Sequence, residues 1–142
     1  MKIKVLIADD EKEFIETLAQ RLEMRDFDVT TVDSGGAAIK IAEKIAFDVI
    51  ILDVQMPEIN GIDALKKIKE TTPLVPVIML TGEATVENAI QGMKLGAFDF
   101  LIKPTETDRL SDKIKQAHAH KHAHEERIRQ AEIENILRTR GW

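Results

Sequence analysis

The chain has 142 residues, of which 44% are hydrophobic and 32% charged, with a net charge of −5 and no cysteine. This balance predicts about one globular domain and excludes a disordered chain, disulfides and thiolate metal sites. The acidic charge argues against nucleic-acid binding, because such a surface needs clustered Lys and Arg to neutralise phosphates. No apolar run reaches the ~20 residues of a membrane span, and the N-terminus lacks a signal-peptide cleavage pattern. We therefore expect a cytoplasmic protein without membrane or nucleic-acid contacts.

Short apolar runs alternate with amphipathic segments along the chain. Runs rich in Val, Ile and Leu predict buried strands at residues 3–8, 28–32, 49–52, 77–80 and 100–102. The segments between them carry apolar residues at helical spacing, such as Phe14, Ile15, Leu18 and Leu22 in the first of them. Ser34 is expected to cap the second helix, and Gly96 to end the fourth. The alternation predicts an α/β fold, a (βα)5 doubly wound five-stranded parallel sheet with right-handed crossovers.

The fifth helix is expected to begin near Glu106 and to be unusually long. No Pro or Gly occurs from Asp108 to Arg140, which predicts an extended C-terminal helix. Residues spaced alternately four and three apart fit a heptad pattern: Leu110, Ile114, Ala117, Lys121, His124, Ile128 and Ala131. Because this seam contains a Lys and a His, the pattern leaves a coiled coil open. We divide the chain into a domain at residues 1–120 and a helical extension at 121–142, either a linker or a dimerising tail.

Four histidines alternate within the predicted fifth helix, at His118, His120, His122 and His124. The pairs four residues apart have the spacing of a zinc site on a helix. Residues two apart, however, point about 200° around the helix, so all four cannot share one ion. A solvated helix face is the favoured interpretation.

Polar residues suited to phosphoryl chemistry follow four of the predicted strands. Asp9 and Asp10 follow the first strand, Asp53 the third, Thr81 the fourth and Lys103 the fifth. Each is ordinary alone, since an Asp after a strand most often caps a helix or turn. Together they should converge, because parallel strands direct ligands to the sheet edge at their carboxyl ends. Three adjacent carboxylates repel unless a cation lies among them, and Mg²⁺ with Lys103 supplies that charge, so the set predicts phosphoryl transfer onto an aspartate.

With these residues in place, the chain resembles the receiver domain of bacterial two-component response regulators, over about residues 2–120. The matching segments are residues 5–11, 48–57, 60–61, 76–82 and 96–104. The resemblance implies the flavodoxin-like receiver fold with strand order 2-1-3-4-5. It also implies a phosphoprotein that takes part in phosphorelay signalling, and that catalyses only its own phosphotransfer and dephosphorylation.

The resemblance also implies roles for individual residues. Asp53 would accept the phosphoryl group from a phosphohistidine of a sensor histidine kinase or phosphotransfer protein. Asp10 and Asp53 would hold Mg²⁺ through their carboxylates, Asp9 through water and Gln55 through its backbone carbonyl. Thr81 and Lys103 would contact the phosphoryl oxygens.

Three further positions are implied to adjust or transmit the reaction. Phe100 corresponds to the family's switch aromatic, which turns inward as Thr81 moves toward the phosphate; an ordinary core role in the fifth strand stays open. Gln55 and Glu83 would tune the lifetime of the acyl phosphate. The bond between Lys103 and Pro104 is expected to be cis.

Three other functions are not favoured: a phosphatase, an electron carrier and a nucleotidase. A haloacid-dehalogenase-like phosphatase needs a second Asp two residues after its nucleophile, whereas Asp9 and Asp10 are adjacent and Asp53 is followed by Val54 and Gln55. A flavodoxin-like electron carrier needs a Ser/Thr-rich phosphate loop and aromatic residues, but the chain has acids there and no Tyr. The P-loop motif of nucleotidases is absent.

The output of the signal stays open between two possibilities. The chain is either a single-domain regulator that acts by protein contact, or the receiver part of a longer regulator, which we favour. In both, we expect homodimerisation through the face formed by the fourth helix, fifth strand and fifth helix.

Overall fold

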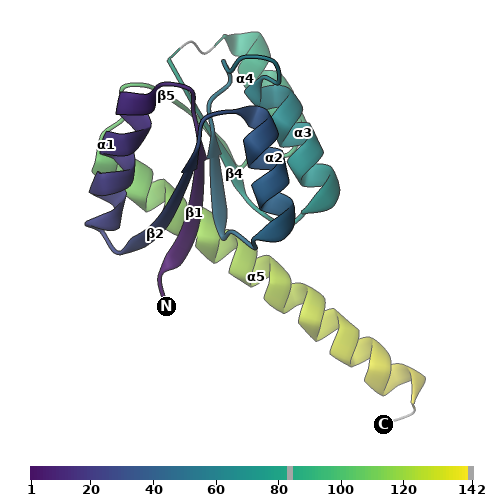
Figure 1. Ribbon diagram of the computed structural model, residues 1–142. Helices are drawn as coiled ribbons and strands as arrows, with labels where there is room; N and C mark the ends of the chain where they lie inside the picture. The colour runs from purple at the N-terminus through teal and green to yellow at the C-terminus, as the bar shows by residue number, and fades with distance from the viewer. Residues whose placement is uncertain (83–84, 141–142) are drawn as a thin grey trace.

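The computed structural model describes residues 1–82 and 85–140 and has the predicted (βα)5 architecture (Figure 1). All sheet pairings are parallel, and the strand order is β2-β1-β3-β4-β5. In chain order the elements are β1 (Ile3–Ala8), α1 (Lys12–Glu23), β2 (Phe27–Val32), α2 (Gly35–Lys44), β3 (Val49–Leu52), α3 (Gly61–Thr71), β4 (Val77–Thr81), α4 (Val86–Lys94), β5 (Asp99–Ile102) and α5 (Thr107–Thr139). The fold class predicted from the sequence is therefore confirmed.

Helices cover both faces of the sheet, and this explains the continuous apolar strands. In β1, Leu6 and Ala8 pack with residues of α2 and α3, whereas Val5 and Ile7 pack with residues of α1 and α5. Successive strand residues point to opposite faces, so a strand that is covered on both sides must be apolar at every position. With helices over both faces of the sheet (Figure 1), polar side chains can gather at the ends of the strands.

Strand pairing moves three boundaries by one residue from those predicted. β2 begins at Phe27, which pairs with Ile3, and β5 begins at Asp99, which pairs with Ile78. β4 includes Thr81. Backbone hydrogen bonds to a neighbouring strand define these ends, and they continue beyond the apolar run that a sequence displays.

Helix-end signals are present where the sequence predicts them. The Ser34 hydroxyl accepts a hydrogen bond from the Ala37 amide at 3.1 Å, which caps α2. Gly96 follows the end of α4 with φ of +98°, a left-handed conformation that suits glycine at a helix C-terminus.

Helix α5 is continuous over 33 residues, as predicted, and runs beyond the rest of the fold (Figure 1). Its buried residues all lie in the first third: Thr107, Leu110, Ser111, Ile114 and Ala117. The first three positions of the predicted heptad pattern therefore contact this chain's own core, and only the later positions are open to a partner. No helix among the described residues has the length and apolar character needed to cross a membrane.

Candidate functional site

The carboxyl ends of β1, β3, β4 and β5 place four of the predicted site residues, which are Asp9, Asp53, Thr81 and Lys103. Backbone hydrogen bonds continue the sheet beyond the strands: the Asp9 amide donates to Val32 O, the Asp53 amide to Ala8 O, and the Lys103 amide to Thr81 O, at 3.2, 3.0 and 2.8 Å. These residues are thus fixed to the sheet through the main chain. Their side chains start from rigid positions on neighbouring strands, as the sequence predicts.

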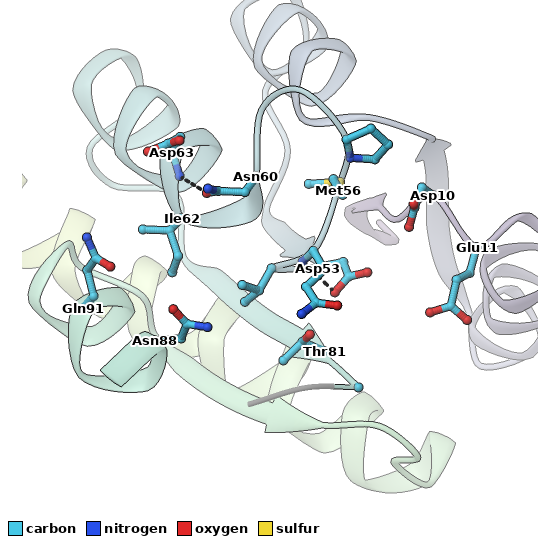
Figure 2. A pocket seen from close by; sticks show the side chains of 14 residues that line it. Asp10, Glu11, Asp53, Met56, Asn60, Ile62, Asp63, Thr81, Asn88 and Gln91 are labelled. Atoms are coloured by element: carbon cyan, nitrogen blue, oxygen red, sulfur yellow. Dashed lines mark hydrogen bonds between the residues drawn. The ribbon is translucent and has the colours of Figure 1, made fainter. Parts of the chain in front are cut away.

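Three carboxylates gather at this edge, and two of them, Asp10 and Asp53, are labelled in Figure 2. Asp9, Asp10 and Asp53 each offer an oxygen within 4.8 Å of the others. Asp9 and Asp53 are only 2% and 4% exposed, whereas Asp10 is exposed at the rim. Burying two carboxylates side by side is costly without positive charge, so this cluster needs a cation.

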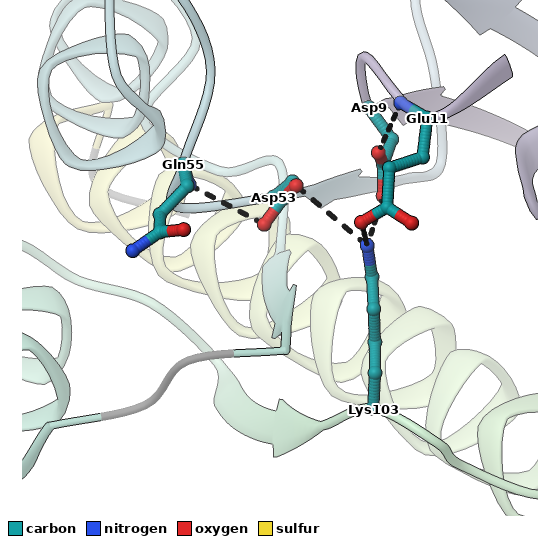
Figure 3. A network of polar contacts seen from close by, with 5 residues as sticks. All are labelled: Asp9, Glu11, Asp53, Gln55 and Lys103. Carbon is teal, nitrogen blue, oxygen red and sulfur yellow. Dashed lines mark hydrogen bonds and ion pairs between the residues drawn. The ribbon is translucent and has the colours of Figure 1, made fainter.

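Lys103 supplies one such charge (Figure 3). Its Nζ lies 2.7 Å from Asp9 Oδ2, 3.0 Å from Glu11 Oε1 and 3.6 Å from Asp53 Oδ2. The same ammonium lies 4.2 Å from the centre of the Phe14 ring, whose π-face is attractive to a cation. Lys103, which follows β5, therefore links Asp9 at the end of β1 to Asp53 at the end of β3.

Burial and hydrogen bonding shift the pKa of both members of the closest pair. Burial raises the pKa of Asp9, and the hydrogen bonds from Lys103 and the Glu11 amide only partly oppose it. Burial lowers the pKa of Lys103, but its hydrogen bonds to Asp9 and Glu11 outweigh that effect, so the net shift is upward. Lys103 is thus held firmly as a cation, while the carboxylates still favour additional positive charge.

The loop after β3 shapes the other side of the site. A Cβ atom at Gly61 would lie 1.9 Å from Asp53 O, so only glycine permits this close approach. The Asn60 side chain accepts a hydrogen bond from the Asp63 amide at 2.9 Å and caps α3. The Gln55 amide in turn donates to Asp53 Oδ1 at 3.3 Å. The Asn60–Gly61 pair therefore helps to orient the Asp53 carboxylate.

The site opens into a cavity of about 950 Å³, seen in Figure 2. Predicted residues that line it include Asp10, Asp53, Gln55 and Thr81. Thr81 is 1% exposed and lies at the end of β4, across the cavity from Asp10. Asp53 thus has both a hydroxyl and an acidic rim around an opening large enough for a phosphoryl donor.

The remaining predicted residues have different places. Phe100 is partly buried on β5 against the core on the α2–α3 side, and a Cβ at Gly92 of α4 would lie 3.7 Å from its ring. The Lys103–Pro104 peptide bond is cis. Glu83 lies outside the described residues.

Several residues contribute to the site without having been assigned a role from the sequence. Glu11 directly follows the acidic pair, so its charge was a visible signal, and it binds Lys103. Phe14 lies one helical turn later, where its spacing indicated only a core position. Asn88 and Gln91 of α4 reach the cavity through the tertiary fold alone.

The donor set fits a hard divalent cation. Mg²⁺ prefers oxygen ligands and is commonly held by one or two carboxylates plus phosphate oxygens and water. Asp53 and the exposed Asp10 both face the cavity, whereas Asp9 is occupied by Lys103. These residues can therefore offer carboxylate oxygens to an ion without first disrupting the pair between Asp9 and Lys103.

Residues 5–115 match the family of the response regulator receiver domain. The chain belongs to this family. The receiver domain is a signalling domain of two-component systems, so the chain has a phosphoacceptor role in such a system.

Similar proteins and structures agree with this membership. The chain is 36% identical over 121 residues to the transcriptional regulatory protein ZraR of Escherichia coli K12, covering 85% of this chain and 27% of ZraR. It is 33% identical over 115 residues to the alkaline phosphatase synthesis transcriptional regulatory protein PhoP of Bacillus subtilis, covering 81% of this chain and 48% of PhoP. The chain thus spans about a quarter to a half of these relatives.

Solved receiver structures have the same fold. A receiver domain from Clostridium thermocellum is 37% identical, with a TM-score of 0.79, covering 85% of this chain and 98% of that one. A CheY-like receiver domain from Methanospirillum hungatei JF-1 is 26% identical, with a TM-score of 0.85, covering 87% and 99%. These similarities confirm the predicted resemblance.

Proposed function

We propose that this receiver domain accepts a phosphoryl group on Asp53 from a phosphohistidine of a sensor histidine kinase or phosphotransfer protein. The observation that carries the proposal is the position of the Asp53 carboxylate, buried beside Asp9, facing Lys103 at 3.6 Å and open to the cavity. Among the described residues, no other carboxylate follows a central strand, lies within ion-pairing distance of Lys103 and also lines the cavity.

Phosphotransfer at this position requires an in-line exchange of one bond for another. A carboxylate oxygen of Asp53 attacks phosphorus, the bond between phosphorus and the donor nitrogen breaks, and the imidazole leaves with the electron pair. In this proposal Lys103 would offset the negative charge on the phosphoryl oxygens, and the Thr81 hydroxyl would donate a hydrogen bond to one of them. Magnesium held by Asp10 and Asp53 would neutralise further charge, and we propose the Gln55 carbonyl as another ligand.

The product remains attached to the protein, so we propose a phosphoacceptor rather than an enzyme that turns over small molecules. Gln55 lines the cavity beside Asp53, where it can limit the approach of water to the acyl phosphate. We propose that Gln55 and Glu83 set its lifetime. A small-molecule phosphatase assay should accordingly show no sustained turnover.

Labelling with acetyl phosphate and Mg²⁺ tests the assignment of Asp53. Intact mass should show one added phosphate that hydroxylamine removes, as expected for an acyl phosphate. Asp53→Asn should abolish the label. Asp63→Asn is a matched control, because Asp63 also lines the cavity but is exposed on α3. Labelling of the Asp53→Asn protein at the same level would overturn the assignment, and labelling that persists without Mg²⁺ would overturn the metal role.

We further propose that phosphorylation promotes homodimerisation through α4, β5 and α5. Large apolar side chains are exposed on this face: Val86, Ile90 and Met93 of α4, and Ile102 of β5. Clusters of exposed apolar residues commonly mark interaction surfaces. Phe100 lies on β5 next to α4, so an inward rotation coupled to Thr81 would alter the same face. The α5 extension would then transmit the change to an output domain or partner.

A further inference from the structure

A second cavity, of about 430 Å³, lies at the opposite edge of the sheet from Asp53. Its walls come from three segments: the end of α3 with the following loop, the turn between α4 and β5, and the middle of α5. We call it the junction pocket, because α5 continues from here beyond the rest of the fold (Figure 1). It is lined by Lys69, Pro73, Leu74, Pro76, Gly96, Ala97, Phe98, His120, Lys121 and His124.

The lining combines positive groups with an apolar wall. None of these ten residues is acidic, although the whole chain has a net charge of −5. Two lysines and two histidines face a surface of proline, leucine, alanine and phenylalanine. The His120 and Phe98 rings lie 5.5 Å apart, centre to centre, so the wall also contains an aromatic pair. Pockets that bind small molecules usually have this composition, a mainly apolar lining with a few polar groups that fix orientation.

Lys69 provides a cation without a compensating carboxylate. Its Nζ donates to Pro73 O at 3.0 Å and to Val75 O at 2.7 Å, both of which are neutral acceptors. Within residues 1–82 and 85–140, no carboxylate lies within ion-pairing distance of this ammonium. Burial lowers the pKa of Lys69, so a nearby anion would relieve an existing cost. An ammonium has three donors, which leaves one for a ligand.

Lys121 adds a second, loosely held cation. Its side chain is 17% exposed, and its Nζ lies 3.8 Å from Asp48 Oδ1 and 3.5 Å from Phe47 O, both long contacts. Asp48 is shared further, because its other oxygen accepts the Lys4 amide at 2.8 Å and His118 lies 3.9 Å away. One carboxylate thus serves several donors, and Lys121 can turn toward an anion at little cost.

We propose that the junction pocket binds a small organic anion, with a phosphonate-, phosphate- or carboxylate-type group at Lys69 and Lys121 and a planar ring against Leu74, Phe98 and His120. The volume lies within the range of small-molecule sites. The alternative is that His120 and His124, which lie four residues apart on α5, bind a transition metal ion in this pocket. The two lysines in the same lining oppose a cation, so the anion is favoured. This site is independent of phosphorylation at Asp53.

Three small probes separate the roles of charge and ring. Phenylphosphonate carries both, methylphosphonate carries only the charge, and benzyl alcohol carries only the ring; none can donate a phosphoryl group. Each would be titrated into the full ¹⁵N-labelled chain without Mg²⁺, following the amides of Gly96, Ala97 and Phe98. The amide of Lys40 on α2, which lines neither cavity, is the reference. Phenylphosphonate should shift the three pocket amides saturably and bind at least about 5-fold more tightly than either other probe.

Matched variants test whether the lysine charge acts locally. Lys121→Gln should weaken phenylphosphonate binding by about 5-fold, the change expected from one partly exposed charge pair. Lys115→Gln makes the same charge change on the exposed surface of α5 outside the lining and should leave binding unchanged.

Several results would overturn the proposal. These are unshifted pocket amides, equal binding of benzyl alcohol, an equal effect of the two lysine variants, or a response of His120 and His124 to Zn²⁺ with none to phenylphosphonate. Because Mg²⁺ and Asp53 are not involved, failure here would leave the proposed phosphotransfer unaffected.

Discussion

Helix α5 has two parts with different sources of stability. Up to Ala117 it buries Leu110 and Ile114 against the sheet, whereas beyond His124 its residues are exposed or nearly so, including Ile128, Ile133, Ile136 and Leu137. The backbone hydrogen-bonding pattern is continuous across both parts. In most proteins the stability of a helix comes from packing of one face rather than from local propensity. Packing against the sheet therefore stabilises the first part of α5. The second part has no such packing, and its apolar side chains stay exposed to solvent.

The largest expected effect separates these two parts directly. Ile114→Ala removes a side chain that is fully buried and should lower the free energy of unfolding by about 2–5 kcal/mol, through lost burial and a new cavity. Ile133→Ala makes the same change at a residue that is 45% exposed and should stay within about 0.5 kcal/mol. Urea unfolding of both variants provides the measurement. Equal losses would show that the extension is packed as tightly as the body.

The next prediction concerns association of the exposed surfaces. Beryllofluoride with Mg²⁺, as a mimic of the phosphorylated state, should tighten the dimer constant about 5–150-fold, the usual range of coupling between two sites. Sedimentation with and without the mimic measures this change. Ile90→Asn on α4 should remove most of the tightening, and Ile133→Ser on the extension a smaller share.

An unchanged constant in the parent chain would exclude coupling through self-association and leave a heterologous partner as the output. Equal losses from the two variants would instead give the extension the same weight as α4.

A third prediction concerns buried charge in the body. Because the pKa of Asp9 is raised on folding, the folded chain binds this proton more tightly than the unfolded chain. The stabilising contribution is therefore present below the unfolded value of about 3.8 and is lost as pH rises through the folded pKa. Without Mg²⁺, the free energy of unfolding of the parent chain relative to Asp9→Asn should therefore fall as the pH rises from about 3.8 through the folded pKa of Asp9.

Urea unfolding across the acidic range would measure the difference between the two proteins. A difference that stays constant with pH would contradict the upward shift. Asp48→Asn provides the control, because it makes the same exchange at a carboxyl that is partly exposed. The same series of measurements would be repeated with it.

The smallest effect is expected for exposed charge in the extension. Glu126 and Arg129 form an ion pair on the surface of α5, three residues apart. Glu126→Gln should change the free energy of unfolding by no more than about 0.5 kcal/mol, because solvent screens such pairs. A loss above about 1 kcal/mol by thermal or urea unfolding would indicate that this segment unfolds together with the body.

Much of the site could be predicted because its residues follow strands in fixed positions. Asp9, Asp53, Thr81 and Lys103 each lie at or just beyond a strand end, and parallel strands bring such ends to one edge. Glu11 and Phe14 show the limit of this reasoning. Their contacts with Lys103 depend on how α1 is placed against the sheet, and no local pattern specifies that placement.

The sequence by itself determined the alternation of strands and helices, the length of α5 and the set of charged residues after the strands, because these follow from periodicity and local backbone preferences. Only the tertiary structure decided which charges pair, that Lys69 has no carboxylate partner among the described residues, and which part of α5 is covered. Leu110 and Ile128 illustrate the difference, since both fit the same heptad pattern, yet one is 1% exposed and the other 39%. Burial and long-range pairing depend on residues far apart in the chain, so spacing along the sequence cannot specify them.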